Sequence, residues 1–263
     1  EIALNLRKAI EKEAGRRLGD LLLLGDTVMG RMCKIVLELA PPVEPPGPGL
    51  DWAVVSEPFF GIPVEEHAIA GLASLPAAFD PQPPERFHAS EDVKMLAHNG
   101  LHAMLACWGH LKGVEHFDEL RDDAEAMELA RLLADEAGTA LSGKHGAALP
   151  RSGYLNYCDS ILRRVTCPVF HDTIARGVRG IMRKLEPGER LVYGVRTVRE
   201  QGIEPVGFAA GLAAAVLVAR RSGETDLDFR DVLTEHCGFD PDEDAELIDL
   251  IEDRHDHLRE TAG

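Results

Sequence analysis

Aromatic residues and cysteines are scarce in this chain of 263 residues. Phe, Trp and Tyr make up 5% of the sequence, and its five cysteines are widely spaced without a CxxC pair. A disulfide-built secreted scaffold is therefore not expected, and the composition is typical of a cytoplasmic protein with reduced thiols. Long apolar runs are also missing, since the longest candidate, residues 206–219, is too short to span a bilayer.

Basic residues are few as well. The chain carries 28 Lys and Arg against 45 Asp and Glu, which gives a formal net charge of −17. A surface of this charge repels nucleic acid and anionic membranes, so neither is expected as a partner. A small-molecule substrate is the expected partner, and the sequence does not indicate an oligomeric state.

A glycine-rich fingerprint for a dinucleotide is absent. The sequence holds no GxGxxG segment that is followed by a helical pattern. The chain also starts at Glu1, inside a helical pattern, so we expect it to be a piece of a longer protein. Residues 1–62 combine one helical pattern with two strand-like runs, 33–39 and 52–56, and are interpreted as the remnant of an α/β nucleotide-binding domain.

Residues 63–263 are predicted to be helical almost throughout, which makes the fold class mainly α. Leu, Ala and Val recur there at helical spacing, and Pro and Gly punctuate the segments. The predicted helices cover residues 64–73, 90–112, 123–142, 150–165, 172–184, 196–202, 206–221, 227–235 and 241–260.

One apolar stretch, Val93–Trp108, stands out because it carries only four polar side chains: Lys94, His98, Asn99 and His102. A segment that is hydrophobic on nearly every side is typical of a buried helix. At ~100° per residue, and with Lys94 at 0°, the other polar positions lie at ~40° (His98), ~80° (His102), ~140° (Asn99) and ~60° (Glu91). A potential base, two imidazoles, an amide and a carboxylate therefore share one side of the predicted helix.

This combination suits the oxidation of a secondary alcohol. A buried Lys94 can act as the general base, because burial disfavours the ammonium form and lowers its pKa. Asn99 and His102 can then hold the reacting oxygen with fixed hydrogen bonds. The structural alternative is that Lys94 extends to the surface and His102 bonds a carbonyl in the core.

The segment Lys94-Met-Leu-Ala-His-Asn99-Gly-Leu-His102 resembles the K-x4-N-x2-H signature of the polyol-specific long-chain dehydrogenases. This family includes the mannitol dehydrogenases, the mannitol-1-phosphate dehydrogenases and hexuronate reductases. A second segment, from Ile161 to Leu191, is similar to a family pattern through these residues: Ile161-Leu-Arg-Arg164, Pro168, Asp172, Arg176, Arg179, Arg183-Lys184-Leu185 and Arg190-Leu191. The resemblance covers roughly residues 28–215.

The resemblance implies a multi-helical C-terminal dehydrogenase domain, like that of 6-phosphogluconate dehydrogenase, over residues 63–263. It implies an NAD- or NADP-dependent oxidoreductase that needs no metal and acts on a polyol, sugar phosphate or sugar acid. Lys94 would be the base, Asn99 and His102 would hold the oxygen, and Glu91 would assist proton transfer. Most of the domain that binds the cofactor would lie outside this chain.

A basic cluster in the second segment has two interpretations. Its cationic side chains, chiefly Arg179, Arg183 and Lys184, can anchor a substrate, since guanidinium groups suit carboxylates and phosphates. Alternatively, they form a salt-bridged helix face. The sequence alone does not indicate which of them points inward.

Two positions depart from the family pattern, and two other functions stay open. Gly30, in Met29-Gly30-Arg31-Met32, stands where the family usually has an Asp that holds polyol hydroxyls. His98 replaces an aliphatic residue and is expected to be a core histidine bonded to a carbonyl or an added polar contact.

One alternative function is a catalytically inactive helical binding or dimerisation module. A metal-dependent hydrolase would rest only on the eleven His, whose spacing argues against it.

Overall fold

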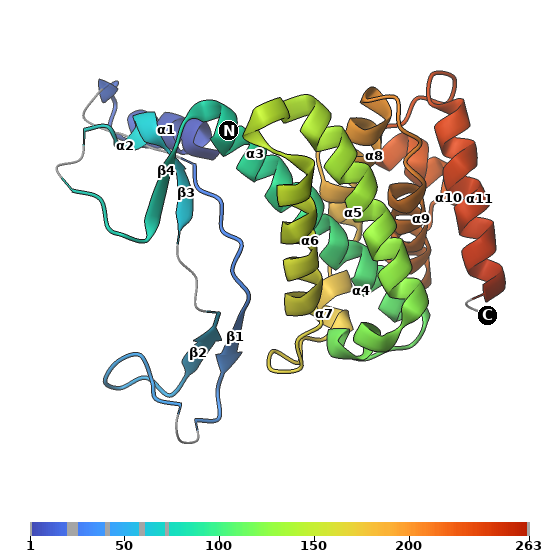
Figure 1. Cartoon of the computed structure of the whole chain (residues 1–263), viewed down its shortest axis with the longest axis horizontal. Coiled ribbons are helices and arrows are strands. Elements are labelled where there is room, and N and C mark those ends of the chain that lie inside the picture. The colour runs from blue at the N-terminus through green and yellow to red at the C-terminus, as the bar shows by residue number, and fades with distance from the viewer. Residues whose placement is uncertain (1, 20–25, 40–42, 58–60, 72–73, 262–263) are drawn as a thin grey trace.

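The computed structural model describes the chain except for residues 1, 20–25, 40–42, 58–60, 72–73 and 262–263. Figure 1 shows two parts: a small N-terminal part of strands and short helices, and a larger body of packed helices. The prediction of a mainly α fold with a short α/β segment in front of it is confirmed.

The N-terminal part contains two small two-stranded sheets. Its elements are α1 (Ile2–Glu13), β1 (Cys33–Val36), β2 (Ala53–Ser56), β3 (Ile62–Glu65), α2 (Glu66–Ile69) and β4 (Phe79–Gln82). β1 and β2 pair in antiparallel fashion, whereas β3 and β4 are parallel. The division that we expect between residues 62 and 63 falls inside β3.

The helical body begins with one continuous helical rod that changes its winding twice. The rod consists of α3 (Pro84–Val93), a π-helical segment η2 (Lys94–Gly100) and α4 (Leu101–Leu111). The remaining elements are η3 (Phe117–Asp122), α5 (Ala124–His145), η4 (Gly146–Ala148), α6 (Arg151–Val165), α7 (Ile174–Val178), η5 (Met182–Leu185), α8 (Arg190–Glu200), α9 (Val206–Arg221), α10 (Phe229–Asp231), η6 (Val232–His236) and α11 (Ala245–Thr261).

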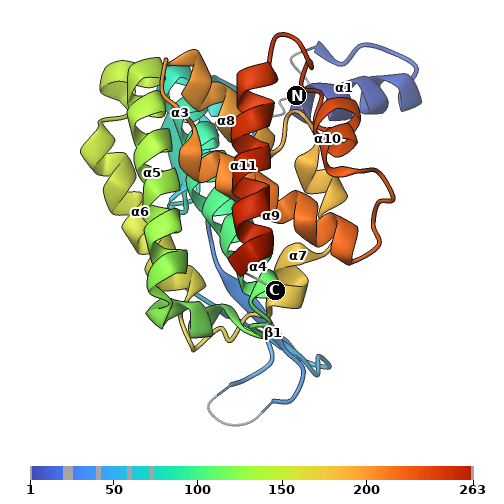
Figure 2. The ribbon, with the colours of Figure 1, turned by 90° about the vertical axis from the view of Figure 1, so that its right-hand side faces the viewer.

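Helix α9 forms the centre of this body. Its residues 207–219 are all buried, and α4, α5, α8 and α11 contact it, as the view in Figure 2 shows. A helix that is apolar on every side is stable only when other helices surround it. The polar helix α5 begins at Asp123, whose side chain accepts a hydrogen bond from the Ala126 amide at 3.0 Å.

Several predicted helix limits were wrong for identifiable reasons. The predicted helix 172–184 is broken into α7 and η5, because Gly180 adopts a left-handed conformation with φ 63°. The predicted helix 64–73 is reduced to α2, since its first residues belong to β3. The rod also starts six residues before position 90, at Pro84, which suits the first turn of a helix.

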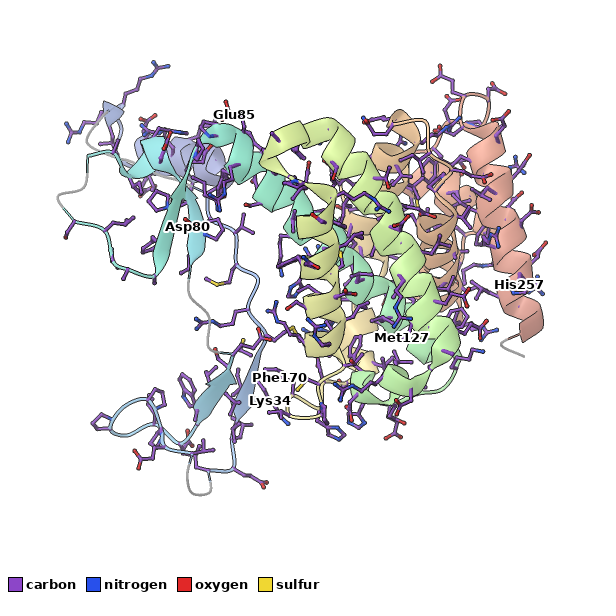
Figure 3. The ribbon with its side chains drawn as sticks, in the orientation of Figure 1. Lys34, Asp80, Glu85, Met127, Phe170 and His257 are labelled. Carbon is purple, nitrogen blue, oxygen red and sulfur yellow. The ribbon has the colours of Figure 1, made fainter. Side chains whose placement is uncertain are left out.

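Arg164 provides a polar anchor that holds the N-terminal part against the helical body. The guanidinium group of Arg164, near the end of α6, donates to both carboxylate oxygens of Glu57 at 2.5 Å and also to the carbonyl oxygen of Gly30. Nearby, the β1–β2 hairpin, which carries Lys34, approaches the loop that carries Phe170 (Figure 3). This anchor fixes residues 28–30 along the edge of the cavity described below.

No helix among the described residues is both long and apolar enough to cross a membrane.

Candidate active site

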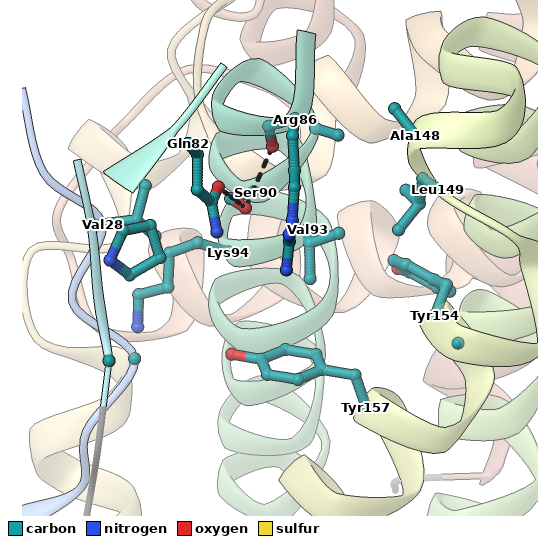
Figure 4. A pocket seen from close by; sticks show the side chains of 15 residues that line it. Val28, Gln82, Arg86, Ser90, Val93, Lys94, Ala148, Leu149, Tyr154 and Tyr157 are labelled. Atoms are coloured by element: carbon teal, nitrogen blue, oxygen red, sulfur yellow. Dashed lines mark hydrogen bonds between the residues drawn. The ribbon is translucent and has the colours of Figure 1, made fainter. Parts of the chain in front are cut away.

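A cavity of about 380 Å³ lies between the N-terminal part and the helical body, and it contains Lys94 (Figure 4). Val28, Gly30, Gly61 and Pro63 form one wall of this cavity. The opposite wall comes from α3, η2 and α6. The polar lining consists of Gln82 from β4, Arg86 and Ser90 from α3, Lys94 from η2, and Tyr154 and Tyr157 from α6.

Lys94 has the properties expected of a base. The pKa of Lys94 is lowered from 10.5 to about 8, chiefly by burial and also by the positive charges of Arg164 and Arg190. No hydrogen bond or ion pair joins its ammonium group to any residue in the described part of the chain. A large fraction of Lys94 is therefore a neutral amine at mildly alkaline pH.

The π-helical segment changes where Asn99 lies relative to Lys94. In a π-helix the backbone bonds run from residue i to i+5, so residues five apart come to lie on the same face. Lys94 and Asn99 are the first and sixth residues of η2. The angular separation of ~140° obtained from regular α-helical winding is therefore wrong. The wider winding of the π-helix brings Asn99 toward the face that carries Lys94.

His102 lies one turn further along the rod, beside a carboxylate. Its Nε2 atom is 3.7 Å from Oδ2 of Asp172, and its ring packs against Phe117 with centroids 4.5 Å apart. Burial lowers the pKa of His102, although the nearby Asp172 carboxylate opposes this shift. His102 is therefore a neutral imidazole whose orientation depends on its two neighbours.

Asp172 is itself held by Arg176, whose Nε atom donates to Oδ1 at 2.5 Å. Burial alone would raise the pKa of Asp172, but the hydrogen bonds from Arg176 and His102 outweigh it and lower the pKa below the usual range. The residue before it, His171, has a φ of 43°, which is uncommon for a residue other than Gly. The sequence pattern included Asp172 but suggested no role for it.

His98 is the most buried of the polar side chains on the rod, with 7% of its surface exposed. Burial lowers its pKa to about 3, and the positive charge of Lys94 adds to this effect. Its Nδ1 atom has no hydrogen-bond partner among the described residues. Its burial agrees with the expectation of a core histidine. The expected hydrogen bond to a carbonyl oxygen is not formed by Nδ1.

Glu91 lies outside the Lys94 cavity. Its side chain is 45% exposed and forms an ion pair with His88 at 3.0 Å. Both residues line a separate, wide hollow of about 530 Å³ together with Asp92. The carboxylate of Asp92 is less exposed than that of Glu91, and it accepts hydrogen bonds from Tyr193 at 2.6 Å and from Lys144 at 2.9 Å.

The predicted substrate anchors are spread over several environments. Arg179 is exposed at the end of α7, and the 60% exposed side chain of Arg183 forms an ion pair with Glu189 at 2.7 Å. Lys184 is buried and donates to the carbonyl oxygen of Gly177. Its charge acts on the pKa of His102, so Lys184 is the member of this set that lies near the rod.

Two cavity residues were not predicted from the sequence. Arg86 and Tyr157 line the same cavity as Lys94, yet no motif marked either residue. Gly30, which stands where the family usually has an Asp, was the sequence feature that could have indicated that another side chain fills this space. A Cβ atom added at Gly30 would lie 3.0 Å from the Tyr157 hydroxyl oxygen, so this hydroxyl occupies the space beside the missing side chain.

Within the described residues, no group of three or more His, Cys, Asp or Glu side chains is arranged to hold a metal ion.

Comparison with known proteins agrees with the motif and the fold. The mannitol dehydrogenase C-terminal domain matches residues 87–237, which is more than half of the chain. The chain belongs to the mannitol dehydrogenase family. The resemblance found in the sequence is thereby confirmed at the level of the family.

The similar proteins are long, and the similarity is distant. The chain is 24% identical over 220 residues to a mannitol-1-phosphate 5-dehydrogenase of Caldanaerobacter subterraneus subsp. tengcongensis, covering 78% of the chain and 54% of that protein. It is 30% identical over 163 residues to the enzyme of the same name from Brevibacillus brevis, covering 62% of the chain and 41% of that protein. The chain thus spans about half the length of the curated relatives it matches.

A solved structure supports the fold. Mannitol 2-dehydrogenase of Pseudomonas fluorescens, in a ternary complex with NAD and D-mannitol, superposes with a TM-score of 0.56 at 19% identity. The superposition covers 81% of this chain and 47% of that protein. The predicted multi-helical dehydrogenase fold is therefore confirmed.

Proposed function

We propose that this chain is the catalytic part of an NAD(P)-dependent oxidoreductase that acts on a secondary alcohol of a polyol, sugar phosphate or sugar acid. The observation that carries the proposal is the combination at Lys94. An amine with a pKa of about 8 projects from a π-helical segment into a cavity large enough for a small polyol. Family membership supports the same class of reaction.

The residues of this chain supply the proton-transfer half of the reaction. The neutral amine of Lys94 takes the proton of the substrate hydroxyl as the C–O bond becomes a carbonyl, and Lys94 becomes an ammonium. Asn99 donates a hydrogen bond to the reacting oxygen from the same face of η2. His102 lies on the next turn of the rod and helps to position the substrate, and Asp172 beside its Nε2 atom fixes the tautomer of its ring. A bound nicotinamide cofactor would accept the hydride from the alcohol carbon.

The described residues do not fit a complete cofactor site. The sequence has no glycine-rich turn between a strand and a helix, so no residue of this chain is assigned to NAD or NADP. We therefore propose that residues 1–62 are the end of a nucleotide-binding domain and that residues 63–263 form the substrate domain. Glu91 stays a prediction as a proton carrier, and from its exposed position it would act through water.

The test is a dehydrogenase screen of the full-length protein with NAD and with NADP. Mannitol, arabinitol, sorbitol, their phosphates and two hexuronates form the substrate panel. We expect turnover by the wild type and a loss of about 10²-fold or more in Lys94→Ala. Lys112→Ala is the matched control, because Lys112 forms an ion pair with Glu125 on the surface at 3.2 Å.

Two outcomes would contradict the proposal. A wild type that is silent over the whole panel would favour the inactive binding or dimerisation module instead. Turnover that survives in Lys94→Ala would show that another group takes the proton.

A further inference from the structure

The cavity that holds Lys94 is positively charged in a strongly acidic protein. The chain has 45 acidic against 28 basic residues, yet none of the fifteen cavity-lining residues is an Asp or a Glu. Two of them, Arg86 and Lys94, are cationic. A neutral polyol does not require such a lining, whereas an anion is attracted by it.

Arg86 is placed to meet an anion. It is the third residue of α3, in the first turn of that helix, where the helix dipole already contributes a positive partial charge. A cation is therefore disfavoured at this position unless a negative group lies nearby. Among the described residues, no side-chain hydrogen bond or ion pair neutralises its guanidinium group. The close-up in Figure 4 shows the Arg86 side chain running from α3 into the cavity, above the ring of Tyr157.

The other charged groups around the cavity do not provide this negative group. Glu57 is paired with Arg164 at 2.5 Å. Asp80 does not line the cavity, and its Oδ2 atom accepts a hydrogen bond from Gln82 at 2.8 Å. Arg86 is therefore an exposed cavity residue that neither of these carboxylates neutralises, and its guanidinium group is accessible to an anionic ligand.

We propose that Arg86 binds a phosphate or carboxylate group of the substrate, so that the enzyme prefers anionic polyol derivatives over neutral polyols. This inference rests on the proposed function, because Lys94 defines the reacting end. Arg86 and Lys94 are eight residues apart on one rod, about 12 Å along its axis. An extended substrate can therefore hold its anionic group at Arg86 and its reacting hydroxyl at Lys94. Planar guanidinium groups bind both anions with paired hydrogen bonds.

The experiment compares Arg86→Gln with wild type on mannitol 1-phosphate, mannitol and a hexuronate, using the full-length protein. We expect the KM for the anionic substrates to rise ~10- to 100-fold with little change in kcat, and the KM for mannitol to stay unchanged. Added salt should weaken the binding of anionic substrates by wild type more than by the variant. The matched control is Arg131→Gln, which removes the same charge from the exposed surface of α5.

The anion could also belong to the cofactor, and the same variant separates the two sources. A raised KM for NAD(P) with an unchanged KM for mannitol 1-phosphate would overturn the proposal in favour of the cofactor. Equal effects on mannitol and on its phosphate, or no effect on either, would also overturn it.

A binding measurement keeps this test separate from the proposed function. Protection against thermal unfolding by mannitol 1-phosphate should be present in wild type and in Lys94→Ala, and lost in Arg86→Gln. If no variant and no substrate gives turnover but this pattern holds, the proposed reaction fails and the anion site stands. If the protection is the same in Arg86→Gln, the anion site fails whatever the activity.

Discussion

Oδ2 of Asp172 lies 3.7 Å from the Nε2 atom of His102, and both oxygens of this carboxylate accept hydrogen bonds from Arg176, with Nε donating to Oδ1 at 2.5 Å. His102 belongs to α4 of the rod, and Asp172 comes from the loop after α6. A carboxylate beside one ring nitrogen favours the tautomer that carries its proton there, which leaves Nδ1 as the acceptor. We therefore expect Asp172 to act through His102 as a positioning residue.

We predict that Asp172→Asn lowers kcat about 10-fold, since the loss of one charge-assisted contact frees the imidazole to adopt the other tautomer. The pH profile of kcat should also change, because the Asp172 carboxylate opposes the lowering of the His102 pKa by burial. Steady-state kinetics over a range of pH would measure both effects.

The matched control for Asp172→Asn is Asp256→Asn. Asp256 lies 3.0 Å from Nδ1 of His255 in α11 and its side chain is exposed, so the same type of pair is removed outside the cavity that contains Lys94. A fall in thermal stability with an unchanged pH profile in Asp172→Asn would mean that the residue is only structural.

The rod could be predicted from the sequence, but its winding could not. Its apolar composition and its four polar residues are local features, so Lys94, Asn99 and His102 were recognised as a group. The π-helical bonding of η2 leaves no mark in the composition, because it depends on how the rod packs between α6 and α8. The separation of Lys94 and Asn99 was misjudged for that reason.

The rest of the cavity depends on contacts between residues far apart in the chain. Tyr157 on α6 meets Gly30 only because Arg164 anchors the N-terminal part. Arg86 belongs to a helical turn that the apolar pattern does not include, so the helix was predicted to start after it. In the basic cluster, the residue with the buried ammonium group is Lys184, and burial cannot be read from a run of like charges.

The pH dependence of the reaction should follow the Lys94 amine. For alcohol oxidation we predict that kcat/KM rises with pH and levels off above about 8, since only the neutral amine accepts a proton. Carbonyl reduction needs the ammonium form and should decline over the same range. Lys94→Arg stays protonated and should be slow in both directions at every pH. A profile for oxidation that is flat across this range would contradict the assignment of Lys94 as the base.

Gly30 and Tyr157 should control how the substrate is held beside Lys94. We predict that Gly30→Ala raises the substrate KM several-fold, because its new methyl group would lie 3.0 Å from the Tyr157 hydroxyl and displace it. Tyr157→Phe should have a similar effect, because it removes a hydroxyl group whose hydrogen bond to the substrate would contribute about 1 kcal/mol. Gly188→Ala is the control, since a Cβ atom there meets nothing within 4 Å. An unchanged KM in both cavity variants would mean that the hydroxyl does not contact the substrate.

Stability should depend on pH through Glu136, a buried carboxyl in the helical core. Its oxygens accept hydrogen bonds from the amides of Gly207 at 2.7 Å and Phe208 at 3.2 Å, at the start of α9. Burial nevertheless raises the pKa of Glu136 from 4.5 to about 7, because these amides compensate for only part of the lost hydration. Between these two values the folded state binds more protons than the unfolded state. This group therefore makes the free energy of unfolding fall as pH rises from 4.5 to about 7, by at most about 1.4 kcal/mol per pH unit.

Glu136→Gln should remove this dependence. We therefore predict that the unfolding free energy of the wild type, minus that of the variant, falls as pH rises through that range. Urea denaturation at several pH values measures it. Glu128→Gln serves as the control, because it makes the same substitution on the exposed side of the same helix. A difference that stays constant with pH would show that Glu136 remains ionised in the folded protein, and that the two amides of α9 outweigh the cost of its burial.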